Sequence, residues 1–409
     1  MTTQKLQYIE GLRGLAACQV ILLHYCSAFL PFLAHLRAPV HYAWEKELSL
    51  SPLFLLLDGY SAVNLFFILS GFVLAPSFMR SEKTFLQLVT KRFLRLFIPI
   101  FSAFTVALAL FLLVPDAKSD AATLSQSGWL VSQAHNPFTL MSLMRDALLN
   151  SMLIGYDGSS LLDYFPNPPG ILVPTKSSLA LNAPTWSLHV EFWGSMLVLA
   201  LAVLRRYVDG AWFSAIFVLV ALMAGTSHYI LFLFGFLLYQ IRGTLLGRRH
   251  VIFAFLGAAL VLSGFYVCIS KNVSVVSVVL IGLRHITLLS AQSNFNWQSQ
   301  VGAMLIFAGV MLNFQLRSFL SVRIVQWLGK VSFSVYLLHF PILLTLGCLV
   351  FTFFARSSYA LACFATFVIG IAVTFAAAAI FETQIDRRAV LFSKRVIGDS
   401  ALSESGKDR

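Results

Sequence analysis

The stretch that decides the fold is residues 358–382, SYALACFATFVIGIAVTFAAAAIFE, whose last residue, Glu382, is its one charged side chain. A helix needs about 20 consecutive apolar residues to cross the hydrocarbon core of a bilayer, so this stretch predicts a membrane-spanning helix. The same measure, applied outward along the chain, predicts further spans at 8–30, 53–79, 93–114, 184–204, 211–225, 227–242, 251–270, 301–316 and 326–354. We therefore expect an all-α polytopic membrane protein with about ten transmembrane helices.

The composition of the 409-residue chain agrees with this fold class. Apolar residues make up 58% of the chain and charged residues 11%, with a mean hydropathy of +0.82, whereas soluble domains run near about 45–50% apolar and about 25% charged. A disordered chain, a coiled coil and a conventional soluble enzyme are excluded. The net charge of +12 lies in short basic clusters between apolar runs, so we expect no nucleic-acid partner. The five cysteines form no CxxC pair, and neither a disulfide framework nor a metal site is expected.

Lysine and arginine positions predict the orientation. With ten spans and the amino terminus inside, most of the 29 lysines and arginines fall in cytoplasmic segments, and both termini are cytoplasmic. An eleventh span would move basic clusters outside, so the apolar piece 275–290 is predicted not to cross. We expect one transmembrane domain over 1–397 and a disordered tail over 398–409. The long outer loop, 115–183, is either a lid or acceptor-binding surface or a loosely ordered connector.

Charged side chains inside the first predicted helix are costly in lipid and indicate a function or a partner. Arg13 and His24 are eleven residues apart and so share one helix face, about 16.5 Å apart along the axis. Glu10, three residues before Arg13, can pair with it. The purely structural alternative is a buried arginine paired with Glu10 and a hydrogen-bonded helix histidine.

Other spans carry comparable groups. Arg92 and Arg95, at the cytoplasmic start of the third span, can clamp a phosphate or simply set topology. Glu191 lies roughly 10 Å deep in the fourth span. The predicted ninth span places three side chains on one stripe by their spacing, namely Ser332, Tyr336 and His339.

Helix rise predicts that these groups lie at two depths. His24, Glu191 and His339 are expected at one level, about 20 Å above the cytoplasmic boundary. Arg13, Arg92 and Arg95 are expected at the cytoplasmic rim below them. Such an arrangement suits transfer from a phosphate-bearing donor to a proton-handling group deeper in the membrane.

The sequence resembles the membrane-embedded acyltransferase 3 family, which includes bacterial O-acetyltransferases of O-antigen and exopolysaccharide. The matching motifs are Ile9 to Ala17 with His24, Leu65 to Phe72, Arg92 with Arg95, Thr185 to Glu191, and Ser332 to His339. The resemblance implies a ten-helix enzyme of the plasma (inner) membrane that moves an acyl group, usually acetyl, from cytoplasmic acyl-CoA to a hydroxyl of a lipid-linked or exported glycan. Its partners would be the lipid bilayer, acyl-CoA and the glycan.

The resemblance also implies residue roles. His24 corresponds to the essential histidine and Glu191 to the fourth-span glutamate, while Arg13, Arg92 and Arg95 would contact CoA. Side chains expected to support these groups or contact substrate are Glu10, Trp186, Ser332, Tyr336 and His339. Asn64 stands where the family often has aspartate, so no carboxylate role is carried over to it.

Two mechanistic routes and two alternative functions stay open at this stage. His24 either acts as general base on the acceptor hydroxyl or first accepts the acyl group itself, while Glu191 orients groups or accepts protons. The acceptor can also be a small molecule such as a macrolide. A transporter or flippase, with the polar stripe as its pathway, is the alternative from a different class.

Overall fold

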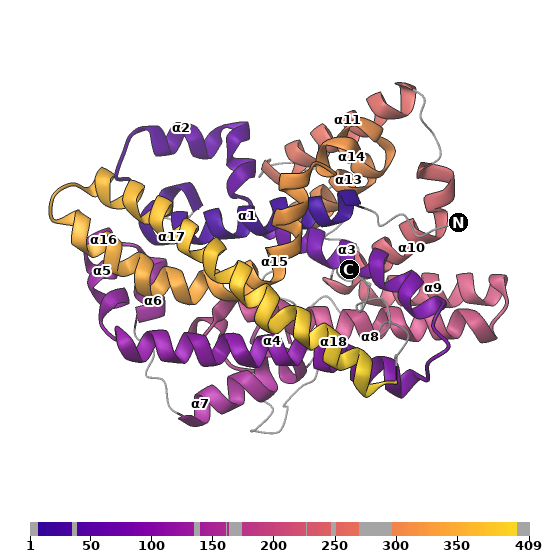
Figure 1. Cartoon of the computed structure of the whole chain (residues 1–409). Helices are drawn as coiled ribbons and strands as arrows, with labels where there is room; N and C mark the ends of the chain where they lie inside the picture. Colours follow the sequence, from indigo (N-terminus) through magenta and orange to yellow (C-terminus); the bar gives the residue numbers. More distant parts are fainter. Residues whose placement is uncertain are drawn as a thin grey trace, which may run out of the picture.

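The computed structural model describes residues 7–34, 39–134, 140–160, 162, 174–225, 227–246, 251–269 and 297–398. Within these residues the chain is helical, with an isolated β-bridge between Tyr156 and Thr175 and no strand. The all-α polytopic fold class is therefore confirmed. The predicted non-crossing element at 275–290 and residues 399–409 of the predicted tail lie outside the described residues (Figure 1).

Most of the predicted spans coincide with long helices. Seven helical segments in the described part of the chain are long and apolar enough to cross a membrane: α1 (Gln7–Phe29), α3 (Gly59–Met79), α4 (Phe85–Leu113), α8 (Trp186–Tyr207), α11 (Val251–Ile269), α15 (Arg323–Ile342) with its continuation to Ala355, and α17 (Tyr359–Phe381) with its continuation to Val396. Two shorter apolar helices, α9 (Gly210–Ala224) and α10 (Tyr229–Leu246), fall on the predicted spans 211–225 and 227–242. The total of ten spans stays a prediction.

The span predicted over 301–316 is not one straight helix. It consists of α13 (Trp297–Leu312) and α14 (Phe314–Leu320), which meet at an angle of 98° and would together make an eighth crossing segment. Asn313 lies at the bend: its side-chain oxygen accepts from the backbone N–H of Leu316 at 2.9 Å and its amide donates to the carbonyl of Ala254 at 2.9 Å. An asparagine that caps a new helix ends the previous one.

The α15 segment changes its winding at a proline. Pro341 has no backbone N–H to donate, and a π-helical turn, η8 (Leu343–Gly347), follows it before the helix resumes as α16 (Cys348–Ala355). Thr345 donates to the carbonyl of Pro341 at 2.6 Å. The helix thus passes through the bundle without ending.

One end of the bundle gathers basic residues and both described chain ends. Gln326 of α15 donates to the carbonyl of Gln7, and Lys83, just before α4, donates to the carbonyl of Gly398 at 3.2 Å. Arg206 of α8 donates to the carbonyl of Ser81 at 2.6 Å. The starts of α1, α4 and α15 therefore lie at the same end as the finish of α18 (Arg387–Val396), as Figure 1 shows on its right-hand side.

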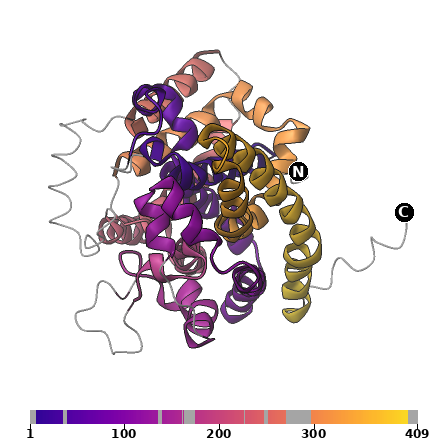
Figure 2. The ribbon, with the colours of Figure 1, turned by 90° about the vertical axis from the view of Figure 1, so that its left-hand side faces the viewer.

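The opposite end carries the long loop between α4 and α8. Its described part contains α5 (Ala117–Ser125), α6 (Gly128–Ala134), α7 (Leu140–Arg145) and the π-helical η3 (Asp146–Ile154). Ser127 donates to the carbonyl of Ser27 at 2.6 Å, and the buried Lys118 donates to the carbonyl of Gln133 at 3.0 Å. These helices cover the end of the bundle that faces the viewer in Figure 2. The described part of the loop is folded against the helices.

Close packing sets the position of α1 in the centre. A methyl group on Gly329 of α15 would lie 2.0 Å from the backbone oxygen of Glu10 in α1, and one on Gly11 would lie 2.0 Å from that of Leu320. Only glycine allows the two backbones to approach this closely. The Gly329 contact fixes the register between α1 and α15, the two helices that carry most of the predicted site, and the Gly11 contact brings α1 against the end of α14.

Candidate active site

Two histidines meet in the middle of the bundle. The Nδ1 atom of His24 in α1 lies 2.9 Å from Nε2 of His339 in α15, and the two rings stack with centroids 5.0 Å apart and an interplanar angle of 25°. The residues are 315 positions apart in the chain. Sequence analysis placed them at the same depth, and the structure brings their side chains into direct contact.

The hydrogen bonds around this pair fix which nitrogen of each ring carries a proton. Nδ1 of His339 lies 3.1 Å from the carbonyl oxygen of Val335. A carbonyl only accepts, so this Nδ1 must donate its hydrogen. With both rings uncharged, Nε2 of His339 is then the acceptor and Nδ1 of His24 the donor. It follows that Nε2 of His24 carries a lone pair.

That lone pair is not used inside the described protein. No hydrogen bond joins Nε2 of His24 to any described residue. His339 is fully buried, whereas His24 is only partly buried although it lies well inside α1. Phe340 meets the His24 ring edge to face at 5.6 Å, and Trp129 of α6 stacks on it at 5.8 Å. A basic nitrogen next to accessible space can take a proton or attack a carbonyl carbon.

Tyr336 extends the contacts of the histidine pair to α8. Its hydroxyl donates to the carbonyl of Pro184 at 2.6 Å and lies 2.6 Å from the hydroxyl of Ser187, while its ring packs on His339 at 5.8 Å. Ser332, the third member of the predicted stripe, instead donates to the carbonyl of Gly329 in its own helix at 2.7 Å. The stripe is therefore divided, with Tyr336 and His339 at the site and Ser332 bonded within α15.

Glu191 does not join the histidines. Arg92 of α4 forms an ion pair with Oε1 of Glu191, and its Nε donates to the hydroxyl of Ser195 at 3.1 Å. Ser70 of α3 donates to the same carboxylate oxygen at 2.7 Å. The side chains of Arg92 and Glu191 are only 9% and 13% exposed. The predicted common depth of Glu191 and the histidines stays a prediction, and the partners that the structure gives Glu191 are Arg92 of α4 and Ser70 of α3.

Arg92 and Arg95 have different surroundings, although they lie three residues apart on α4. Arg92 is buried, whereas Arg95 is exposed. The guanidinium of Arg95 interacts electrostatically with Arg92 and Arg13, and also with the carboxylates of Asp386 and Glu10. A clamp that uses both arginines equally is therefore not formed. Arg95 is the member of the pair that is accessible to a ligand.

Two further cations, Arg13 and Lys330, lie at the same end of the bundle as Arg95. Arg13 pairs with Glu10 at 3.6 Å, as the sequence predicted, and both side chains are about one-third exposed. Lys330 of α15 pairs with Glu382 at 3.4 Å while its own side chain remains 56% exposed. We call Arg13, Arg95 and Lys330 the cationic rim. Its charges are accessible, which is the condition for contact with phosphates.

Trp186 lies away from the histidines. Its ring packs on Phe67 of α3 at 6.5 Å and on His228 at 5.5 Å. It therefore contributes to packing between α8, α3 and the start of α10. Its predicted role in supporting the site or contacting substrate stays a prediction.

Sequence reasoning missed several residues of the site. Ser70 and Ser195 carry no signal beyond small size, which also suits plain helix packing. Trp129 belongs to the outer loop, where no periodicity connects it to α1. An aromatic residue in a loop next to a membrane helix is the only signal that could have pointed to it.

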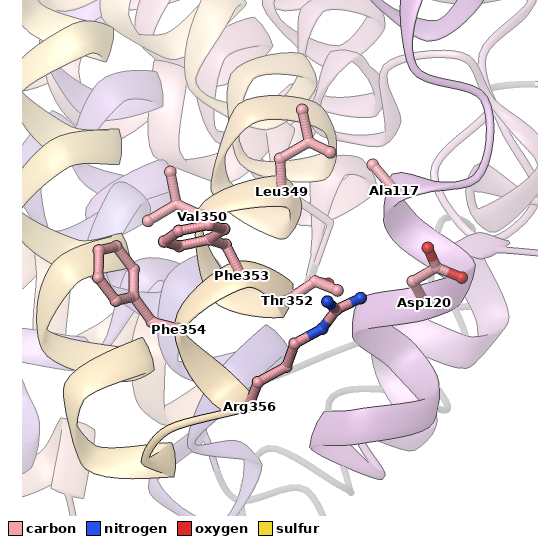
Figure 3. A pocket seen from close by; sticks show the side chains of 8 residues that line it. All are labelled: Ala117, Asp120, Leu349, Val350, Thr352, Phe353, Phe354 and Arg356. Carbon is pink, nitrogen blue, oxygen red and sulfur yellow. The ribbon is translucent and has the colours of Figure 1, made fainter.

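A separate hollow of about 420 Å³ opens between α5 and α16, at the end of the bundle opposite the cationic rim. Figure 3 shows its wall, in which Arg356 extends toward Asp120 across an otherwise apolar lining that includes Leu349 and Phe353. None of the predicted site residues lines it. The hollow is therefore distinct from the histidine pair.

The fold and the family comparison together define a class of protein. Long apolar helices arranged around two histidines in contact define an integral membrane protein with a polar centre. The model of the acyltransferase domain family, acyltransferase 3, matches residues 6–382. The chain belongs to this family and is a membrane acyltransferase, and all five quoted motifs lie inside the matched range. No curated protein and no solved structure matches the chain.

Proposed function

We propose that this membrane acyltransferase is an O-acetyltransferase of the inner membrane that moves an acetyl group from cytoplasmic acyl-CoA to a hydroxyl of a cell-surface or exported glycan. Family membership supports acyl transfer. The cationic rim at one end and the folded loop at the other support a donor and an acceptor that approach from opposite sides. The excess of lysine and arginine at the rim end favours the cytoplasm for the donor.

The observation that carries the proposal is the unshared lone pair on Nε2 of His24. In the general-base route this nitrogen takes the proton of the acceptor hydroxyl while the oxygen attacks the thioester carbon. A carbon–oxygen bond forms, the carbon–sulfur bond breaks, and the proton passes from His24 to the departing thiolate of CoA. His339 keeps its hydrogen bond from Nδ1 of His24 throughout, so the ring stays in its orientation.

The same lone pair supports a second route. Nε2 of His24 attacks the thioester carbon directly, and CoA leaves as thiolate. The acceptor oxygen then attacks the acetyl-histidine, the carbon–nitrogen bond breaks to restore His24, and the hydroxyl proton passes to the CoA thiolate. Rapid denaturing quench at neutral pH of the protein with labelled acetyl-CoA, in the absence of acceptor, separates the two routes because an acetyl-histidine is hydrolysed quickly in acid. Label retained on the wild-type protein and absent from His24→Ala indicates the covalent route, whereas no retained label indicates general-base catalysis.

Arg13 and Arg95 are proposed to bind the phosphates of CoA. Arg13 and His24 are separated by about 16.5 Å along α1. The donor must therefore have an anionic end and a reactive end at that separation, which suits an extended acyl-CoA thioester. Arg92 is proposed to act indirectly, because its guanidinium is already bonded to Glu191 and Ser195. Glu191 is correspondingly proposed to hold α4, α3 and α8 in place.

The decisive experiment is acetyl transfer by purified, reconstituted protein. Labelled acetyl-CoA is supplied with surface glycan extracted from a deletion strain, and the expected result is label on glycan hydroxyls that depends on His24. Transfer to a macrolide but not to the glycan would show that the acceptor class is wrong. Neither transfer nor hydrolysis of acetyl-CoA, with the protein correctly folded, would favour the transporter.

A further inference from the structure

Trp129 occupies a specific place beside the reactive histidine. Its ring lies nearly parallel to that of His24, with an interplanar angle of 26°, and meets Phe340 edge to face at 5.9 Å. His339 stacks on His24 as well, at 25°. His24 is therefore held between aromatic rings from α15 and from the outer loop.

The outer loop holds Trp129 in this place by several bonds. Ser127, two residues before it, donates to the carbonyl of Ser27, which lies in α1 one turn after His24. The hydroxyl of Ser127 also accepts from the backbone N–H of Leu130, whose side chain is fully buried. Lys118 ties α5 to α6 through the carbonyl of Gln133. The indole is thus fixed relative to His24.

Trp129 nevertheless keeps accessible surface. It is only half-buried, and no described residue hydrogen-bonds to its indole N–H. An indole offers a flat apolar face and a single donor at its edge. A sugar ring has the complementary surfaces: a face of C–H groups and a rim of hydroxyls. Loop helices that cover the end of the bundle opposite the cationic rim are also where an acceptor would approach.

Building on the proposed function, we infer that Trp129 is the acceptor-binding residue on which a sugar ring of the glycan stacks, with one hydroxyl directed to Nε2 of His24. The indole of Trp129 and the ring of Phe340 meet the His24 ring at 5.8 Å and 5.6 Å, so a sugar ring packed on the part of the indole that His24 leaves uncovered lies next to the histidine. Phe340 forms the adjoining wall, and the indole N–H can bond a neighbouring hydroxyl. The substrate class is therefore a ring sugar that presents a free hydroxyl beside its apolar face.

The test separates acceptor binding from structural support. Trp129→Ala and Trp129→Phe are assayed with acetyl-CoA and the de-acetylated surface glycan of a deletion strain. The control is Trp44→Ala, which removes a tryptophan that is 46% exposed at the start of α2 (Trp44–Leu50). In Trp129→Ala the KM for glycan should rise about 10-fold, the equivalent of one lost ring contact with its hydrogen bond. The KM for acetyl-CoA and the rate of acetyl-CoA hydrolysis should be unchanged. Trp129→Phe should stay within about 3-fold of wild type because it keeps an aromatic face.

Each other outcome has a definite meaning. An unchanged KM for glycan in Trp129→Ala overturns the inference. So does a parallel loss of glycan transfer and acetyl-CoA hydrolysis, because that pattern shows that the indole merely supports His24. If wild-type protein transfers no acetyl group to the glycan at all, the proposed function fails instead, and Trp44→Ala should then look the same as wild type.

Discussion

The histidine pair and the arginine–glutamate pair are both contacts between side chains of different helices, but we assign catalysis to the first pair and structural support to the second. Each joins side chains from distant parts of the chain, His24 with His339 and Arg92 with Glu191. In the second pair the carboxylate oxygen and the guanidinium are further bonded to Ser70 and Ser195. In the first pair Nε2 of His24 has no hydrogen bond to any described residue. The difference teaches that the chemistry of the remaining atoms decides the role: a neutral imidazole nitrogen is a base and nucleophile, whereas a carboxylate paired with a guanidinium mainly holds helices together.

Removal of the histidine lone pair should have the largest effect. In His24→Ala the turnover number for acetyl transfer should fall by about 10²- to 10⁴-fold, which is the usual contribution of a general base. Transfer of labelled acetyl at saturating substrates measures it, with thermal unfolding as the control for folding. A normally folded His24→Ala protein that works at the wild-type rate would show that the pair is only structural.

Disruption of the ion pair should instead lower stability. Glu191→Ala leaves the Arg92 guanidinium buried without its carboxylate, which costs about 3–5 kcal/mol. The double replacement Arg92→Met with Glu191→Leu should recover most of that loss, since apolar side chains of similar size need no partner. Thermal unfolding in detergent measures both variants. If the double variant were no more stable than Glu191→Ala, the unpaired Arg92 guanidinium would not be the cause of the lost stability.

Replacement of Arg95 should affect acetyl-CoA binding and leave stability nearly unchanged, whereas disruption of the Arg92 ion pair should lower stability. Because Arg95 is exposed, Arg95→Ala should change the free energy of unfolding by no more than about 0.5 kcal/mol. Loss of a charge-assisted hydrogen bond should raise the KM for acetyl-CoA about 10- to 100-fold. Arg388→Ala, which removes an exposed arginine from α18 at the same end of the bundle, is the matched control. Equal effects of the two variants would indicate a general charge effect rather than a phosphate contact.

Asp146 offers a smaller comparison with Glu191, because it is a buried carboxylate held by neutral donors. It accepts from the backbone N–H of Leu181 at 3.1 Å and from the amide of Asn150 at 2.8 Å. Burial raises the pKa of Asp146, and these hydrogen bonds only partly offset it. Asp146→Ala should cost about 1–3 kcal/mol by leaving donors unpaired, whereas Asp146→Asn should cost less than about 1 kcal/mol.

The pH dependence of these two variants follows from the sign of the shift. A carboxyl whose pKa is raised on folding binds its proton more tightly in the folded state, so its contribution is complete at low pH and declines as pH rises through the raised pKa. Wild type should therefore lose stability relative to Asp146→Asn as the pH rises from about 4, the pKa of an unperturbed aspartate, through the raised pKa of Asp146. The unfolding temperatures of wild type and Asp146→Asn across this range provide the measurement. If the difference between the two unfolding temperatures did not change with pH, the raised pKa of Asp146 would be contradicted.

The sequence predicted the helices and the chemically important positions better than it predicted their partners. The length of an apolar run identifies α1, α3, α4, α8, α11, α15 and α17, because a helix that spans the hydrocarbon core needs about 20 apolar residues. Periodicity within a helix also predicts that Tyr336 and His339 lie on one face. Which helix faces that side is set by packing between distant segments, so the Arg92 contact with Glu191 and the Trp129 contact with His24 were not predictable. The bend at Asn313 was missed because hydropathy does not register a capping side chain.

The most direct test of the central claim is the protonation of the His24 ring. Nitrogen NMR of histidine-labelled protein at neutral pH, with His24→Gln used to assign the signals, reports which ring nitrogen carries hydrogen. The account predicts a protonated Nδ1 and an unprotonated Nε2 on His24. A protonated Nε2 in the resting protein would remove the base and nucleophile and contradict the account.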